Sequence, residues 1–425
     1  MTQSGRVDYE AVSRAQARLL SSRRLSTSDL VAAYRVVRTA TPDAYTEKFV
    51  AALISQAYGL SAREARLPVL AEAVEVAREA ATADPRHLKV LTDTLGTYQR
   101  GLYDAERRAE GFEACREQAR IGEQAYEAGA VTFPLYGSWN LACRLAEEGD
   151  HAQAATLFEA MVRNGGRGPR TGDDFWTKIA WIAETEAAGD HTRARGAMRM
   201  LVDQDKARAE QETGPYARVI WELLLLASMD REHGREADAE ACDSETEEVL
   251  TLLASKGEPK NWSNILAWWA VLAGLTGRTQ DRPAPGEPEP PLFASLDWSP
   301  DLRRTYLGPG RENLQAEIPR LAELAERDPA SYLGRLVEVQ RKHTLRSITY
   351  WKNRSWRVTD ELRGCFDEGV RLSRELVELD EPMAVAALSR ALADRAAMHV
   401  AARDFPPALR DFRESHRAVS INRHI

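Results

Sequence analysis

The sequence predicts an all-α protein, built as a solenoid of stacked antiparallel helix pairs, on three observations. The composition is rich in Ala, Leu, Arg and Glu with only 9 Phe in 425 residues, a bias that favours helix over sheet. No segment shows the alternation of apolar and polar residues that a half-buried strand requires. A short turn-like segment also recurs with a period near forty residues, which is typical of stacked helix pairs. We therefore expect about twenty helices.

The recurring segment ends in alanine at the same offset each time. Gly149–Ala154 reads GDHAQA and returns forty residues later as GDHTRA at Gly189–Ala194. It returns again as GREADA at Gly234–Ala239 and, more distantly, as RDFPPA at Arg403–Ala408. Each copy is expected to be the turn between the two helices of a pair.

Proline and apolar spacing place the helices in chain order. Helix pairs are expected from Ser28 to about Thr279 and again from Asn313 to Ile421, with apolar residues recurring at intervals of three and four. Helices should stop before prolines, because the residue before proline avoids the α region and proline has no amide donor. Such stops are predicted at Thr41-Pro42, Asp84-Pro85, Asp328-Pro329 and Glu381-Pro382.

The chemistry of the turns predicts how each pair closes. Gly149 and Gly189 can adopt the left-handed conformation that reverses the chain, and Asp150 and Asp190 can cap the helix that follows. The alanine of each turn segment would then let the second helix approach the first closely. The residues four positions further on should fill the seam; in the first two copies they are Phe158 and Met198.

This combination resembles the tetratricopeptide repeat family, whose units have a small pair within the first helix, a glycine turn, then alanine and an aromatic residue. Leu141-Ala142, Gly149, Ala154 and Phe158 match that pattern. The resemblance implies a right-handed solenoid whose concave groove binds peptides or proteins. The chain departs from the pattern with Asp243 in place of an aromatic, and with Asp230 and Thr185 where the family favours a large ring.

Proline divides the predicted solenoid into two arrays. Pro283, Pro285, Pro288, Pro290 and Pro291 fall within nine residues, which predicts an extended, semi-rigid connector. Leu296 to Gly310 would continue it as an ordered loop packed on the array. The predicted domains are an N-terminal array over 1–280, a connector over 281–311 and a C-terminal array over 312–425. The turn at Gly277 lacks its second helix, and a helix from the C-terminal part could complete that pair.

Charge, cysteine usage and hydropathy narrow the class of protein. The net charge of −8 argues against a surface devoted to nucleic acid or to an anionic membrane. Four scattered cysteines, Cys115, Cys143, Cys242 and Cys365, are expected to be free thiols in a reducing compartment. The uncharged stretch Asn261–Gly277 is shorter than a bilayer requires and is expected to be a buried helix. With no signal core at its start, the chain is expected to be cytoplasmic.

Three aromatic residues share one position in the repeat. Tyr136, Trp176 and Trp221 each stand thirteen residues before a turn glycine, with Trp139 nearby. The tetratricopeptide resemblance would place this part of the first helix on the concave groove. One interpretation is an aromatic ladder that anchors a peptide or an apolar ligand. The alternative is that the rings pack in the core between repeats. We favour this alternative, because the position of a residue on a helix is assigned unreliably from the repeat spacing alone.

The segment from Arg335 to Arg357 is the most basic part of the chain, with seven Arg or Lys residues and the single acid Glu338. Tyr350, Trp351 and Trp356 lie among these charges. We expect the segment to meet an acidic protein or peptide rather than nucleic acid, because the chain is net negative. The proposed contacts are Arg341, Lys342, Arg346, Lys352, Arg354 and Arg357.

Catalytic and metal-binding motifs are missing from the sequence. It contains no His-Glu-x-x-His, no Gly-x-Ser-x-Gly, no phosphate loop and no dinucleotide glycine fingerprint. Asp173-Asp174 is interpreted as a helix cap. His151 and His191 occupy equivalent turn positions, but no Cys or third His shares their spacing, so they are interpreted as solvated. We expect no enzyme activity, no cofactor and no metal.

The leading functional hypothesis is an intracellular scaffold or receptor that holds a protein or peptide partner in its groove. The alternatives are a transcriptional regulatory protein that senses a ligand or peptide, and an all-helical enzyme with a hidden catalytic cavity. Neither a membrane partner nor direct nucleic-acid binding is expected. The exposed end of the interrupted array offers a surface for a homodimer.

Overall fold

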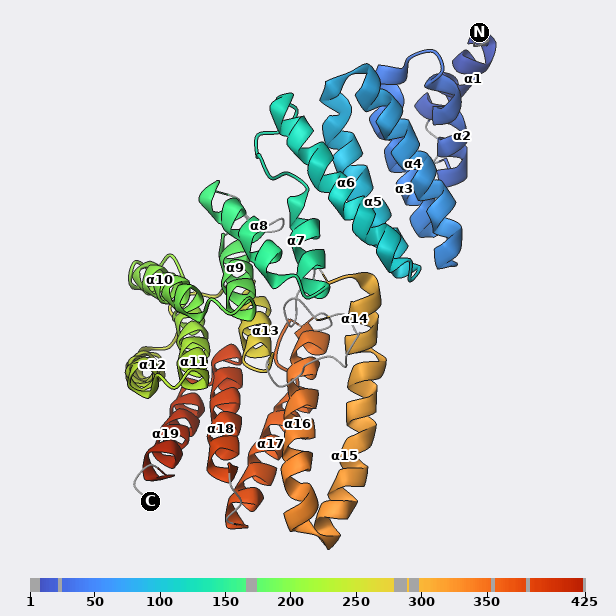
Figure 1. Cartoon of the computed structure of the whole chain (residues 1–425). Helices are drawn as coiled ribbons and strands as arrows, with labels where there is room; N and C mark the ends of the chain where they lie inside the picture. The colour runs from blue at the N-terminus through green and yellow to red at the C-terminus, as the bar shows by residue number, and fades with distance from the viewer. Residues whose placement is uncertain are drawn as a thin grey trace. The chain divides into compact units, whose positions relative to one another are not determined.

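The structure is a computed structural model, and it describes residues 8–21, 25–165, 174–278, 289, 298–352, 356–379 and 383–422. Every regular element in these ranges is helical, which confirms the all-α prediction (Figure 1). Consecutive helices pack against one another along most of the chain, as a helical solenoid requires. No helix in these ranges combines the length and the apolar composition needed to cross a membrane.

The chain folds as two compact units. The first comprises Met1–Thr177 with Ser299–Asp301, and the second comprises Lys178–Trp298 with Leu302–Ile425. Helix α9 (Phe175–Ala187) and helix α14 (Pro300–Leu307) contain the divisions. The two compact units are therefore not the two predicted arrays, because helices from both sides of 281–311 belong to the second unit.

The first unit contains consecutive helices that pack on their neighbours in sequence. They are α1 (Tyr9–Leu20), α2 (Thr27–Val37), α3 (Pro42–Gly59), α4 (Arg63–Ala83), the short 3₁₀ turn η1 (Pro85–His87), α5 (Leu88–Asp104), α6 (Arg108–Glu127), α7 (Ser138–Glu147) and α8 (His151–Arg163). Helix α3 begins at Pro42 and α4 ends just before Asp84-Pro85, as the prolines predicted. The core between α3, α4 and α5 is made of side chains such as Phe49, Leu53 and Leu91, which are almost completely buried.

The second unit contains helices from both ends of its sequence range. They are α10 (His191–Glu210), α11 (Tyr216–Glu232), α12 (Glu236–Lys256), α13 (Ile265–Leu275), α15 (Pro309–Arg327), α16 (Pro329–Lys352), α17 (Asp360–Glu378), α18 (Ala384–Ala401) and α19 (Phe405–Asn422). Helices α15 to α19 follow one another as packed neighbours (Figure 1). Helix α13 packs on α11, α16 and α18, and α12 packs on α19. These long-range contacts form the core of the unit.

The contact between α13 and α16 supplies the partner missing after Gly277. A Cβ atom at Gly277 would overlap the side chain of Leu345 on α16, so glycine permits the close approach of the two elements. Trp269 on α13 is buried against Phe366 of α17, with ring centroids 6.0 Å apart. A helix from the C-terminal part therefore packs where the pattern of repeats left a gap, and Asn261–Gly277 contains the buried helix expected of it.

The predicted turns have the predicted geometry. Gly149, Gly189 and Gly234 have φ values of +78°, +87° and +69°, and Arg403 adopts the same left-handed region at φ +64°. The side chains of Asp150 and Asp190 accept hydrogen bonds from the backbone amides of Gln153 and Arg193, each at 3.2 Å. The alanines that end the four segments are fully buried: Ala154, Ala194, Ala239 and Ala408. The turn prediction is confirmed at the level of caps and packing.

The connector region differs from the prediction where the structure describes it. Residues 279–288 and 290–297, which include the proline run, lie outside the described residues. Pro300–Leu307, expected within an ordered loop, forms helix α14 instead. The expected packing on the array is present within the first unit, where the Ser299 amide donates to Glu147 Oε1 at 2.8 Å and Arg108 pairs with Asp301 at 3.0 Å. The predicted domain boundary over 281–311 and the handedness of the solenoid stay predictions.

Candidate functional site

A cavity of about 550 Å³ lies within the second unit. Its walls come from α11, α12, α13, α16, α17, α18 and α19, so the long-range packing described above creates it. The apolar lining is mainly aliphatic and includes four aromatic side chains: Trp221, Trp269, Phe366 and Phe412. Cavities of this size and apolar character accept small molecules or a few residues of a peptide.

The indole groups of the two tryptophans differ in their hydrogen bonding. Trp221 is almost completely buried, and its Nε1 donates to the backbone oxygen of Ala397 on α18 at 3.1 Å. Trp269 is equally buried, but its indole N–H has no acceptor in the described part of the chain. Buried donors almost always have a partner in proteins, so Trp269 is an exception to that rule and Trp221 follows it.

A second cavity of about 460 Å³ adjoins the first along α18. Arg341, Arg390 and Asp394 line both cavities, as do Phe366 and Met383. The two hollows therefore share a wall that combines two cations with one carboxylate.

Arg341 is held in place by α18. Its Nε donates to Asp394 Oδ2 at 2.7 Å, and its Nη2 lies 3.3 Å from both Asp394 Oδ1 and Thr276 Oγ1. A guanidinium held by a carboxylate through two nitrogens is positioned more rigidly than one with a single contact. Arg341 and Asp394 thus neutralise each other and fix the shared wall.

Arg390 has no hydrogen bond or ion pair within the described ranges, although it lies one helical turn before Asp394. Its side chain is open to the cavities. Partial removal of the guanidinium from water and the positive charge of Arg341 lower the pKa of Arg390. The carboxylates of Asp394, Glu338 and Glu232 oppose that shift. An arginine stays charged in any protein environment, so Arg390 presents a cation for which the site supplies no direct counterion.

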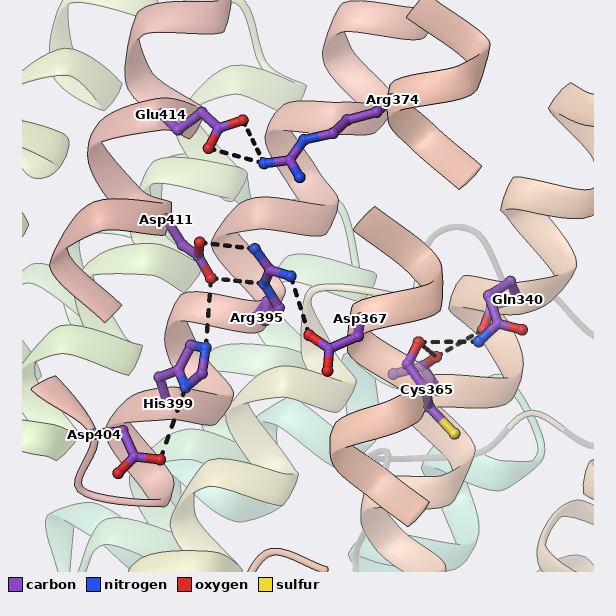
Figure 2. Close-up of polar contacts among 10 residues, drawn as sticks. Gln340, Cys365, Asp367, Arg374, Arg395, His399, Asp404, Asp411 and Glu414 are labelled. Carbon is purple, nitrogen blue, oxygen red and sulfur yellow. Dashed lines mark hydrogen bonds and ion pairs between the residues drawn. The ribbon is translucent and has the colours of Figure 1, made fainter. Parts of the chain in front are cut away.

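Helix α18, which carries Arg390, is fixed between its neighbours by a second arginine. Arg395 donates to both oxygens of Asp411 on α19, at 2.7 and 2.9 Å, and to Asp367 on α17 at 3.0 Å (Figure 2). His399 Nε2 lies 3.6 Å from the same Asp411 carboxylate. Burial is the main cause that lowers the pKa of His399. These contacts hold α17, α18 and α19 together.

A second group of charged residues also lines the first cavity. Asp243 on α12 is buried and pairs with Arg231 of α11, and His416 Nδ1 of α19 lies 3.4 Å from its Oδ2. Burial raises the pKa of the Asp243 carboxyl, and the positive charge of Arg231 opposes that shift. This cluster ties α12 to α11 and α19.

The four residues predicted as an aromatic ladder have different surroundings. Tyr136 is not on a first helix, because α7 begins only at Ser138; it lies in the preceding turn and donates to Asp93 Oδ1 at 2.6 Å. A Cβ atom at Gly122 would overlap the backbone oxygen of Tyr136, so the turn sits directly against α6. The expectation of three equivalent helical positions is wrong for Tyr136.

The other aromatic residues pack against protein. Trp139 stacks edge-on against Phe158 at 5.1 Å, and Trp176 against Phe175 at the same distance. Both are half-buried, whereas Trp221 is almost completely buried. Of the four, only Trp221 lines the candidate cavity. A single aromatic ladder over Tyr136, Trp139, Trp176 and Trp221 stays a prediction.

The predicted basic patch is divided along the length of α16. Arg341 lines both cavities and Lys342 lines the second, whereas Arg346 lies over the ring of Tyr306 at 4.8 Å. Lys352 is half-buried at the end of the helix, about 16 Å from Arg341 at 1.5 Å per residue. Arg357 is exposed near Trp356, and Arg354 lies outside the described residues.

Sequence reasoning missed Arg390, the residue on which the candidate site depends. Arg390 and Asp394 are spaced like an ion pair on the surface of a helix, and such a pair gives no hint of a cavity. Arg390 stands out only in the structure, where Asp394 pairs with Arg341, 53 positions earlier in the chain.

The remaining predicted features can be compared directly. All four cysteines are free thiols, and burial raises the pKa of Cys115 to about 12 and of Cys242 to about 11. Such thiols are poor nucleophiles and poor ligands at neutral pH. Asp173 lies outside the described residues, and Asp174 directly precedes α9.

Comparison with known proteins gives this chain no family. No protein-family model matches the sequence, and no curated protein matches it significantly.

Proposed function

We propose that the second unit is a binding module that takes an apolar segment bearing a carboxylate, such as the end of a peptide chain or an acidic side chain of a partner. The observation that carries the proposal is Arg390, a cation at the junction of two cavities that has no direct counterion in the described part of the chain. A ligand carboxylate would supply that counterion. The proposal keeps the predicted binding role and the predicted acidic partner, and it moves the contact to α18.

The apolar lining supports a ligand with a hydrophobic body. Trp221, Trp269 and Phe366 are among the side chains that line the first cavity, and aromatic side chains are frequent anchors in binding interfaces. Arg390 beside this apolar lining favours a peptide that carries a carboxylate over a purely lipid-like molecule.

Selection from a randomised heptapeptide library with free carboxyl termini tests the proposal. We expect the wild-type protein to enrich apolar peptides that contain a carboxylate close to an aromatic or aliphatic residue. Arg390→Gln should weaken the selected peptides by about 10- to 100-fold, because a hydrogen bond to a charged group contributes about 1.5–3 kcal/mol. Trp269→Phe, which removes only the indole N–H and part of the ring, should weaken them by a smaller factor.

Arg371→Gln is the matched control. Arg371 is exposed on α17 and pairs within its own helix with Glu368 and Glu375, so its removal should leave peptide binding unchanged. Equal binding by wild type and Arg390→Gln, or enrichment of peptides without any carboxylate, would contradict the proposal.

A further inference from the structure

Two histidines and a glutamate meet at successive turns of the second unit. Glu186 lies near the end of α9, His191 is the first residue of α10, and His233 directly follows α11. The turns at Gly189 and Gly234 both reverse the chain in the left-handed conformation, and α10 packs on α11. Stacking of the repeats therefore places the start of one second helix beside the end of the next first helix.

The three side chains converge on one carboxylate oxygen. Glu186 Oε1 lies 2.9 Å from His191 Nδ1 and 2.6 Å from His233 Nε2. One ligand atom from each residue lies within 4.8 Å of the other two. The imidazole rings face each other with centroids 3.7 Å apart and an angle of 36° between their planes. The arrangement brings two nitrogen donors and one oxygen donor to a single point.

This donor set is the one that transition metals prefer. Zinc is commonly bound by imidazole nitrogen and carboxylate oxygen at about 2.0–2.2 Å, and sites with three protein ligands keep the fourth position for water. The side chains of His191, His233 and Glu186 are 42%, 24% and 23% exposed, so water can reach the point where they meet. The second oxygen of Glu186 is buried and has no hydrogen-bond partner in the described ranges, which leaves it available as a further ligand atom.

We propose that Glu186, His191 and His233 bind one divalent transition-metal ion, with zinc as the best match to two imidazoles and a carboxylate. The ion would replace the hydrogens shared between the rings and Glu186, and it would join α9, α10 and α11 at one point. This proposal departs from the expectation of no metal, which considered His151 and His191 as a pair one repeat apart. The residues grouped with His191 come from the preceding helix and from the next turn, and the comparison of His151 with His191 included neither of them.

Titration of untagged, chelator-treated protein with cobalt and then zinc tests the site. We expect one equivalent of Co²⁺ to give the visible absorption of a tetrahedral nitrogen and oxygen site, and Zn²⁺ to displace it. His191→Ala and His233→Ala should each weaken Zn²⁺ binding by more than about 100-fold, because even the loss of an outer-shell partner costs about 10- to 100-fold. Zinc should also raise the unfolding temperature of the wild type and leave that of both variants unchanged.

His151→Ala is the matched control, since His151 begins α8 at the equivalent turn position of the first unit. It should bind one equivalent of metal like the wild type. Glu186→Gln keeps the shape of the side chain, and it provides a third variant that removes a ligand charge without a cavity. Circular dichroism of each variant establishes that it is folded. Absence of stoichiometric binding by the wild type, or binding unchanged in the folded His191 and His233 variants, would overturn the proposal.

Discussion

Asp230 allows a quantitative test of how the repeats are joined. Its carboxylate on α11 is fully buried, and its Oδ1 accepts hydrogen bonds from Arg195 Nε at 2.6 Å and from Arg235 Nε at 2.9 Å. Arg195 comes from α10 and Arg235 from the turn before α12. One buried acid thus holds three consecutive elements, at a position where the tetratricopeptide resemblance expects a large ring.

The expected losses of stability follow from the burial of these groups, because Asp230 is fully buried and the two arginines are partly exposed. Each arginine is 28% exposed, so Arg195→Ala or Arg235→Ala alone should cost about 1–2 kcal/mol of the free energy of unfolding, the usual value of a charged hydrogen bond reduced for solvent screening. The double variant leaves a buried carboxylate without any cation, which should cost about 3–5 kcal/mol. We therefore expect the double loss to reach or exceed the sum of the single losses.

Adding Asp230→Asn to the double variant should recover about 2 kcal/mol, because the unpaired charge is removed while the shape is kept. Equilibrium urea unfolding followed by circular dichroism measures all of these differences on one scale. Failure of Asp230→Asn to restore any stability in the double-arginine background would refute the reasoning, since the penalty would then not come from a buried charge.

Two further predictions concern buried side chains of the same protein. Trp221→Ala should lower the free energy of unfolding by about 3–5 kcal/mol, because the ring is buried and its N–H donates a hydrogen bond to Ala397. Trp176→Ala should lower it clearly less, because Trp176 is half-buried. Equal losses for the two variants in urea unfolding would contradict the structure. Burial and the charge of Arg311 lower the pKa of His343 to about 4. The unfolded state, with a pKa of about 6.5, then binds the proton first, so stability is present above pH 6.5 and falls by up to about 3 kcal/mol between pH 6.5 and pH 4. The variant His343→Gln should show a shallower loss over that window, and an identical pH profile would contradict the assignment.

The local parts of this fold were predictable from sequence because their causes are local. A glycine at positive φ, an aspartate cap and a buried alanine act within six residues, so the segments at Gly149 and Gly189 carry all the information that their turns need. The proline stops at Pro42 and Pro329 are equally local. The period of the repeat then predicts stacked pairs, as observed in the described ranges.

The candidate site could not be predicted in this way, because its contacts join distant segments. Trp221 donates a hydrogen bond to Ala397, and Asp394 pairs with Arg341 instead of Arg390. The apolar spacing along each of these helices predicts the helix itself and does not indicate the contact. Sequence analysis therefore found Trp221 and Arg341 as candidates, but it did not place them in one cavity and it missed Arg390.

Buried ion pairs join several helices of the second unit. At positions where a large ring would seal a seam by apolar contact, Asp230 and Asp243 form buried ion pairs instead. An ion pair needs its partner at one distance and in one direction, whereas an apolar ring accepts many neighbours. Asp243 lies 3.4 Å from His416 and so links α12 to α19 at the lining of the first cavity. The residue that departs from the tetratricopeptide pattern therefore also lines the candidate binding site.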